Sequence, residues 1–231
     1  MNKKLSIIIS VFNEEKTILN VLKSVSKLKN FYNLEIIVIN DGSKDDSEGI
    51  IKQNDYLYDF FINYSKNLGK GYAIKKGLEK ASGEFIIFQD ADAEYDPEEI
   101  KKFIEVIERF NPDVILGSRF NYDKYTRSHN IINKFGNLIL TFVFNLLFNT
   151  TFTDIYCCYL CFRKELLEIH KIKSTGFEQQ AEILSRVIKK GNYFYEVPVN
   201  YNGRSIKEGK KIRFYHIIPV FIKIISERLK N

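Results

Sequence analysis

Short apolar runs alternate with helical patterns through the first half of the sequence, and this alternation restricts the fold more than any other feature. Short runs rich in β-branched residues indicate buried strands, and apolar residues spaced three and four apart indicate helices. The expected strands are residues 5–11, 34–39, 59–63, 85–88 and 114–116, and the expected helices are residues 14–28, 44–54, 69–81 and 97–110. Strands that alternate with helices form a mostly parallel sheet with helices on both faces. The sequence therefore predicts an α/β fold with its ligand site beyond the carboxyl ends of the strands.

The second half of the chain contains two longer apolar segments. Residues 135–148 are nearly all apolar, and residues 212–225 are similar but include Pro219 and Lys223. Helices of this length span about 20 Å, which is short of the ~30 Å hydrocarbon core of a bilayer. We expect them either to complete the core or to lie in a membrane interface or against a lipid chain.

The charge balance indicates an anionic partner. The formal net charge is +6 and the pI is about 9.0. Such an excess fits a nucleotide, a phospholipid surface or a nucleic acid. The sequence contains no nucleic-acid recognition motif, so we expect no nucleic-acid partner.

The cysteines and the N-terminus bear on the compartment. Cys157, Cys158 and Cys161 are an odd, clustered set inside an apolar run, which indicates buried thiols in a reducing compartment rather than a disulfide framework. The apolar run after Met1 is too short for a signal peptide. We therefore expect the protein in the cytoplasm.

An acidic cluster follows the fourth expected strand. Asp90 and Asp92 alternate there, so both carboxylates point in a similar direction and repel one another unless a cation lies between them. Mg²⁺ and Mn²⁺ bind carboxylate and phosphate oxygens together, and such an ion would neutralise a leaving diphosphate. Alternatively, the cluster is an acidic turn before the helix that starts at Pro97.

Polar or glycine-containing segments follow other strands. They are residues 10–15, Asn40-Asp41-Gly42-Ser43, Asn67-Leu68-Gly69-Lys70-Gly71 and Gly117-Ser118-Arg119. At the Asn67–Gly71 segment, backbone N–H groups and Lys70 could meet phosphate. Each segment alone is also compatible with an ordinary turn or helix cap.

Together, in this order, the segments resemble those of the family 2 glycosyltransferases with a GT-A fold, and most of all the dolichyl- or polyprenyl-phosphate mannose or glucose synthase branch. The resemblance continues through Gly176-Phe177 with Glu182, Glu196-Val197-Pro198-Val199 and Gly203-Arg204-Ser205. It covers nearly the whole chain. It implies one domain over residues 1–231, with a nucleotide-sugar-binding half at 1–120 and an acceptor-binding half at 121–231.

The resemblance also implies roles for individual residues. Asp92, Arg119 and Asp154 would be catalytic, and Asp92 with Glu94 would bind Mg²⁺ or Mn²⁺. Arg119 and Arg127 would meet the acceptor phosphate. The nucleotide sugar would contact Phe12, Glu14, Ile39, Asp41, Lys70, Asp90, Ala91, Arg204 and Lys210.

The sequence departs from the family pattern at several positions. Ser10 replaces the usual Pro, Phe12 the usual Tyr and Asn40 the first Asp of its motif. Residues 155–160, after Asp154, lack the polar residues of the family pattern, so the sequence departs from that pattern on the acceptor side. His129, His170 and His216 accompany no carboxylate motif, and we interpret them as non-catalytic.

The implied reaction is transfer of a sugar, with inversion, from a nucleotide diphosphate sugar such as GDP-mannose or a UDP-sugar. A polyprenyl or dolichyl phosphate acceptor is already anionic near neutral pH and needs no strong base. A sugar hydroxyl in a glycan would need a carboxylate base, and Asp154 and Glu182 are the candidates. With the lipid acceptor, we expect the protein on the cytoplasmic face of an anionic membrane, bound peripherally.

Proteins of other classes share parts of this pattern. A sugar-phosphate nucleotidyltransferase and a nicotinamide-dependent dehydrogenase both need a glycine-rich loop after the first strand, where this chain has residues 10–15. A non-catalytic nucleotide-sugar-binding relic remains as an alternative, although Asp90, Asp92 and Arg204 are intact.

Overall fold

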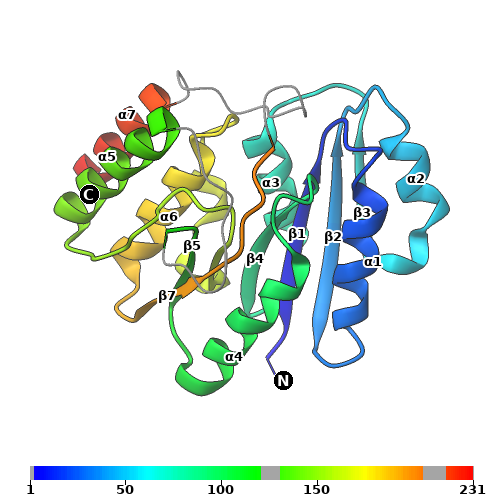
Figure 1. The fold of residues 1–231 in the computed structure, drawn as a ribbon, viewed down its shortest axis with the longest axis horizontal. Helices are drawn as coiled ribbons and strands as arrows, with labels where there is room; N and C mark the ends of the chain where they lie inside the picture. Colours follow the sequence, from blue (N-terminus) through cyan, green and yellow to red (C-terminus); the bar gives the residue numbers. More distant parts are fainter. Residues whose placement is uncertain (1–2, 121–130, 205–216, 231) are drawn as a thin grey trace.

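A computed structural model of the protein describes residues 3–120, 131–204 and 217–230. It contains a seven-stranded sheet in the order β3-β2-β1-β4-β6-β5-β7 (Figure 1). The strands are β1 (Leu5–Val11), β2 (Leu34–Asp41), β3 (Phe60–Tyr64), β4 (Phe85–Asp90), β5 (Val114–Ser118), β6 (Leu160–Arg163) and β7 (Phe194–Pro198). All neighbouring pairs are parallel except β4–β6 and β5–β6. The predicted mostly parallel sheet is therefore confirmed.

The helices cover both faces of this sheet, as the alternating pattern predicts (Figure 1). They are α1 (Ile18–Leu28), α2 (Ser47–Gln53), α3 (Lys70–Lys80), α4 (Ile100–Phe110), α5 (Ile131–Phe148), α6 (Gln179–Lys190) and α7 (Ile217–Leu229). The central strands β1, β2 and β4 are buried almost throughout. This burial explains why they are continuous apolar runs rather than alternating ones.

The strand register brings the polar segments to one edge of the sheet. Ser10 at the end of β1 pairs with Asp90 of β4, and Val11 pairs with Asn40 of β2. Because these strands are parallel, their carboxyl ends meet there. The predicted location of the ligand site follows from this register.

The two apolar segments of the second half are helices that pack on one another. α5 begins at Ile131, earlier than predicted, and α7 covers the described part of the segment predicted at 212–225. Figure 1 shows α5 and α7 together at the end of the molecule remote from β3. In the part of the chain that the structure describes, no helix is long and apolar enough to cross a membrane.

Candidate active site

A cavity of about 420 Å³ opens at the carboxyl edge of the sheet. Its wall combines the ends of β1, β2, β4 and β5 with side chains from α3, α5, α6 and α7. Ten of the predicted site residues line it: Phe12, Glu14, Asp41, Lys70, Asp90, Ala91, Asp92, Glu94, Arg119 and Arg204. The fold thus brings together residues that are more than a hundred positions apart in the sequence.

Asp41 organises the glycine-containing loop. Its carboxylate accepts the backbone N–H groups of Leu68 (2.8 Å) and Gly69 (3.0 Å), and burial raises its pKa. Gly71 donates its backbone N–H to the carbonyl of Thr175 at 2.8 Å. These three N–H groups are therefore engaged within the protein. The suggestion that the backbone of this loop meets phosphate is not supported at these positions.

Ile39 does not reach the cavity through its side chain. It is completely buried in β2, and a β-carbon added at Gly77 of α3 would lie 2.9 Å from its Cδ1. The Ile39 side chain therefore packs in the core and is not among the residues that line the cavity. A buried strand residue belongs to the core whenever a helix packs directly on it.

The acidic cluster lies at the centre of the cavity. Lys70 Nζ contacts Asp90 Oδ1 at 2.5 Å, and Ala93, with φ of 57°, turns the chain between Asp92 and Glu94. Burial, together with the nearby charges of Asp90 and Glu94, raises the pKa of Asp92 to about 7. Mutual repulsion of this kind is what a bound cation relieves.

Arg204 reaches this cluster from the far end of the chain. Its guanidinium contacts the two carboxylate oxygens of Glu14 at 2.9 and 3.0 Å, Glu94 at 3.3 Å and Asp92 at 3.4 Å. The sequence assigns Arg204 to the nucleotide sugar. In the structure its guanidinium faces the three carboxylates of Glu14, Asp92 and Glu94, which all line the cavity.

The acidic residues are suitable for a metal that is partly coordinated by the ligand. Among the described residues, no group of three or more His, Cys, Asp or Glu side chains is arranged to hold an ion by itself. Mg²⁺ usually takes one or two carboxylates and completes its shell with water and substrate phosphate. Asp92 and Glu94, both on the cavity wall, fit an ion held by two carboxylates together with water and substrate phosphate.

Arg119 and Asp154 form a buried ion pair at the end of β5. Arg119 Nε and Nη2 donate to the Asp154 carboxylate at 2.6 and 2.8 Å, and the Arg119 backbone N–H adds a bond of 3.1 Å. Asn137 of α5 donates to the same carboxylate at 2.7 Å. Burial alone would raise the pKa of Asp154, but Arg119 and these hydrogen bonds hold it below its usual value. Arg119 lines the cavity, whereas Asp154 lies behind it.

Glu182 lies in a separate network at the junction of α6 and α7. It is completely buried and accepts the backbone N–H groups of Lys173 and Ser174, while Arg186 contacts it at 2.9 Å. Burial would raise its pKa, but the bonds from Ser174 and Lys173 and the charge of Lys223 lower it. It is not among the residues that line the cavity.

Several cavity residues were missed by sequence reasoning. Tyr201 donates its hydroxyl to Glu94, and Tyr156 donates to the carbonyl of Phe177 at 3.0 Å. Asn137 and Gln179 also line the wall. Tyr156 entered the sequence analysis only within residues 155–160, which lack the expected polar residues. Asn137 and Gln179 lie in helices, and no local motif marks them.

Some predicted residues lie outside the described chain, and the three cysteines are buried, with Cys158 beside the cavity. Arg127, His129, Lys210 and His216 are outside the described residues. Cys157, Cys158 and Cys161 are buried free thiols whose pKa values burial raises, in agreement with the structural interpretation.

The sheet order and the acidic cavity at its carboxyl edge define a GT-A type α/β glycosyltransferase fold. Glucosyl-3-phosphoglycerate synthase of Mycobacterium tuberculosis, in a complex with Mn²⁺, UDP and glucosyl-3-phosphoglycerate, has a TM-score of 0.75 at 17% identity, over 98% of this chain and 80% of that one. TarS of S. aureus has a TM-score of 0.59 at 18% identity, over 97% and 71%. These likenesses establish the fold.

Sequence comparison gives the family. The family described as Glycosyl transferase family 2 matches residues 6–169, and the chain belongs to it. An uncharacterized protein of Methanocaldococcus jannaschii is 31% identical, over 94% of this chain and 97% of its own length. The UDP-N-acetylglucosamine–dolichyl-phosphate N-acetylglucosaminyltransferase of Methanococcus voltae is 29% identical, over 91% of each chain. A dolichyl-phosphate β-glucosyltransferase of Trichomonas vaginalis is 31% identical, over 54% of this chain and 42% of its own.

Proposed function

We propose that the chain transfers a sugar, with inversion, from a nucleotide diphosphate sugar to a polyprenyl or dolichyl phosphate. Two relatives are named for transfer to dolichyl phosphate, one from UDP-N-acetylglucosamine and one of a glucosyl group. Both fit the acceptor class that the sequence motifs suggest.

The environment of the two candidate bases favours this acceptor over a sugar hydroxyl. Asp154 is fully buried behind Arg119 with a lowered pKa, and Glu182 is buried in another network. A general base must reach the proton that it removes. A phosphate monoester avoids this requirement, because its oxygen is already anionic near neutral pH. The burial of both carboxylates therefore supports a phosphate acceptor most strongly.

The same cavity offers what a lipid phosphate needs. The Arg119 guanidinium lines the wall and could hold the acceptor phosphate, oriented by Asp154. Apolar side chains line the neighbouring wall and could contact the first isoprenoid units; they are Leu140, Phe177, Ile217 and Val220. Cation and apolar surface therefore lie side by side, which suits an amphipathic acceptor.

We also propose a divalent metal, Mg²⁺ or Mn²⁺, at Asp92 and Glu94. Burial and the neighbouring carboxylates of Asp90 and Glu94 raise the pKa of Asp92, and a bound cation would stabilise its charged form. When bound, the ion would stabilise the charge that develops on the leaving diphosphate. Arg204 would then exchange part of its contact with the acidic cluster for contact with phosphate.

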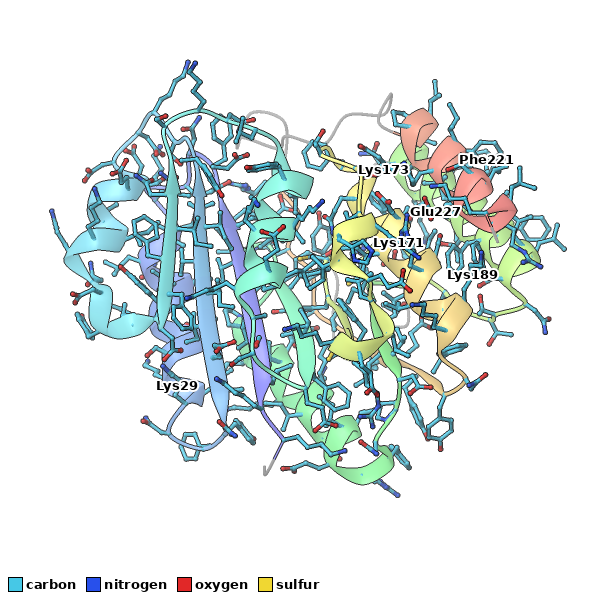
Figure 2. All side chains as sticks on the ribbon, turned by 180° about the vertical axis from the view of Figure 1, so that it is seen from behind. Lys29, Lys171, Lys173, Lys189, Phe221 and Glu227 are labelled. Atoms are coloured by element: carbon cyan, nitrogen blue, oxygen red, sulfur yellow. The ribbon has the colours of Figure 1, made fainter. Side chains whose placement is uncertain are left out.

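The cytoplasmic face of a membrane is the proposed location, with peripheral binding. Exposed apolar side chains cover the outer faces of α5 and α7, including Phe135, Phe142 and Ile222. Figure 2 shows Lys173 and Lys189 near α7, and both side chains are exposed. An apolar helix face beside basic side chains suits an anionic membrane surface.

Acceptor-dependent release of the nucleoside diphosphate tests the proposed function. UDP- and GDP-sugars are incubated with the protein and Mn²⁺, with or without undecaprenyl phosphate. We expect undecaprenyl phosphate to stimulate release. Stimulation by glycan acceptors alone would favour a sugar hydroxyl as the nucleophile. Donor binding without release in the presence of any acceptor would favour the non-catalytic nucleotide-sugar-binding relic.

A further inference from the structure

Gln179 has a buried amide nitrogen that lacks a hydrogen-bond partner among the residues that the structure describes. The residue is 2% exposed, and its Nε2 atom is buried. Leaving such a donor unpaired is costly, and most buried polar side-chain atoms have a partner. Because Gln179 also lines the cavity, a ligand can supply the missing acceptor.

Neighbouring polar side chains are already engaged. Gln180, the next residue of α6, donates its Nε2 to the carbonyl of Cys157. Glu178, the preceding residue, accepts the backbone N–H of Gly176 at 3.3 Å. Glu178 and Gln180 thus form hydrogen bonds within the protein. The amide nitrogen of Gln179 forms none with the residues that the structure describes.

The position of Gln179 relates it to the sugar rather than to the nucleoside. A β-carbon at Gly71 would lie 2.8 Å from the Gln179 β-carbon, so Gln179 flanks the first turn of α3. Lys70, the residue before Gly71, contacts Asp90 in the acidic cluster. Phe12, directly after β1, and Asp41, at the end of β2, line the cavity on the side of β4 that leads toward β3. A donor with its nucleoside there and its diphosphate at Asp92 would extend its sugar toward α6.

We propose that the Gln179 amide donates a hydrogen bond to the transferred sugar, either to a ring hydroxyl or to an acetamido carbonyl, and that this contact selects the donor sugar. The inference rests on the proposed function and deepens it. Sites that hydrogen-bond a particular polar group discriminate strongly against analogues that lack it, because the protein group is then left unpaired.

Gln179→Met and Gln179→Glu test the inference. Methionine keeps the volume without a polar group, and glutamate keeps the shape without an N–H donor at neutral pH. We expect both variants to bind UDP or GDP as the wild type does. Binding of UDP-N-acetylglucosamine or GDP-mannose, whichever the wild type prefers, should weaken about tenfold. The melting temperature of ligand-free Gln179→Met should equal or exceed that of the wild type, because an unpaired buried group is removed.

Ser185→Ala is the matched control. Ser185 also lies in α6 and has a buried hydroxyl without a partner among the described residues, but it does not line the cavity. We expect this variant to leave both affinities unchanged. Equal weakening of the nucleoside diphosphate and the nucleotide sugar in the Gln179 variants would overturn the inference, as would unchanged binding of the sugar derivative. A wild type that binds no nucleotide sugar would instead overturn the proposed function and this inference with it.

Discussion

At the scale of single residues, burial decides what each carboxylate can do. Asp154 was a candidate base on sequence grounds, but in the structure it accepts bonds from Arg119 and Asn137 and has a lowered pKa. A carboxylate held in this way orients its partner and resists protonation. We therefore assign Asp154 a positioning role for Arg119 in the proposed reaction.

Asp154→Asn should separate positioning from base catalysis. Removing one charge of a buried pair is expected to cost about 3–5 kcal/mol of stability. The kcat of the folded variant should fall less than the roughly 10²- to 10⁴-fold that loss of a general base produces. Arg119→Ala should be more severe, because it removes the cation that would face the proposed acceptor phosphate. The pH–rate profile checks the assignment: a profile that loses its acidic limb only in Asp154→Asn would show that Asp154 takes a proton.

Asp92→Asn should abolish transfer without unfolding the protein. The substitution removes a hard anionic ligand but keeps the shape, and it also removes one of the repelling charges of the cluster. The melting temperature without metal should therefore be equal to or higher than that of the wild type. Glu98→Gln, at an exposed carboxylate nearby in the sequence, serves as the control. Wild-type activity in Asp92→Asn, or in excess chelator, would contradict the metal assignment.

At the scale of elements, one buried carboxylate ties together the amino-terminal edge of the sheet. Glu35 of β2 accepts bonds from Lys4 (2.8 Å) and Ser6 (2.6 Å), and from the backbone N–H (2.7 Å) and hydroxyl (2.6 Å) of Ser82. Burial would raise its pKa, but Lys4, Ser6 and Ser82 lower it to about 2. The network joins β1, β2 and the turn before β4, far from the site.

The depressed pKa of Glu35 predicts a pH dependence of stability. A carboxylate whose pKa is lower in the folded state stabilises the fold above its unfolded pKa and loses that contribution as the pH falls toward the folded value. Glu35→Gln should therefore cost on the order of 2 kcal/mol at pH 7, and the difference from the wild type should shrink between about pH 4 and pH 2. Urea unfolding at several pH values measures it. A difference that does not change with pH would contradict the assignment.

The outer faces of α5 and α7 should determine membrane binding. Phe135, Phe142 and Ile222 are 64%, 68% and 60% exposed, so replacing all three by serine should leave the fold intact. Loss of this apolar surface should weaken co-sedimentation with anionic vesicles about tenfold or more at low salt. Phe31→Ser is the control, because Phe31 is 72% exposed but lies in the turn after α1. Equal binding by the triple variant and the wild type would contradict this role.

Periodicity predicted most elements of the first half, because buried strands and amphipathic helices have strong local signals. It did not predict β6 or β7 as strands. β6 is a four-residue strand that inserts antiparallel between β4 and β5, and its position depends on pairing across the chain. The local sequence Leu160–Arg163 does not indicate a strand at this position, because short apolar runs are compatible with helix and strand alike.

At the scale of the whole molecule, the sequence predicted where the site lies better than it predicted which side chains contact one another within it. Register at the sheet edge follows from parallel strands, so the convergence of Asp41, Asp90 and Arg119 could be predicted. The contacts of Arg204 with Glu14, Glu94 and Asp92 could not be predicted. Glu14 lies 190 positions away in the sequence, and the contact with Asp92 depends on the rotamer of Arg204. Gln179 and Asn137 reach the cavity through helix packing, which no short motif encodes.

The acceptor proposed for this protein is an anionic lipid phosphate that needs no base from the protein. The most direct measurement is incubation with a labelled nucleotide sugar, Mn²⁺ and undecaprenyl phosphate, followed by organic extraction. We predict label in the organic phase that mild acid releases as free sugar, and we predict that the Asp154→Asn variant still forms this product. Label on a glycan acceptor with none on the lipid would contradict the claim.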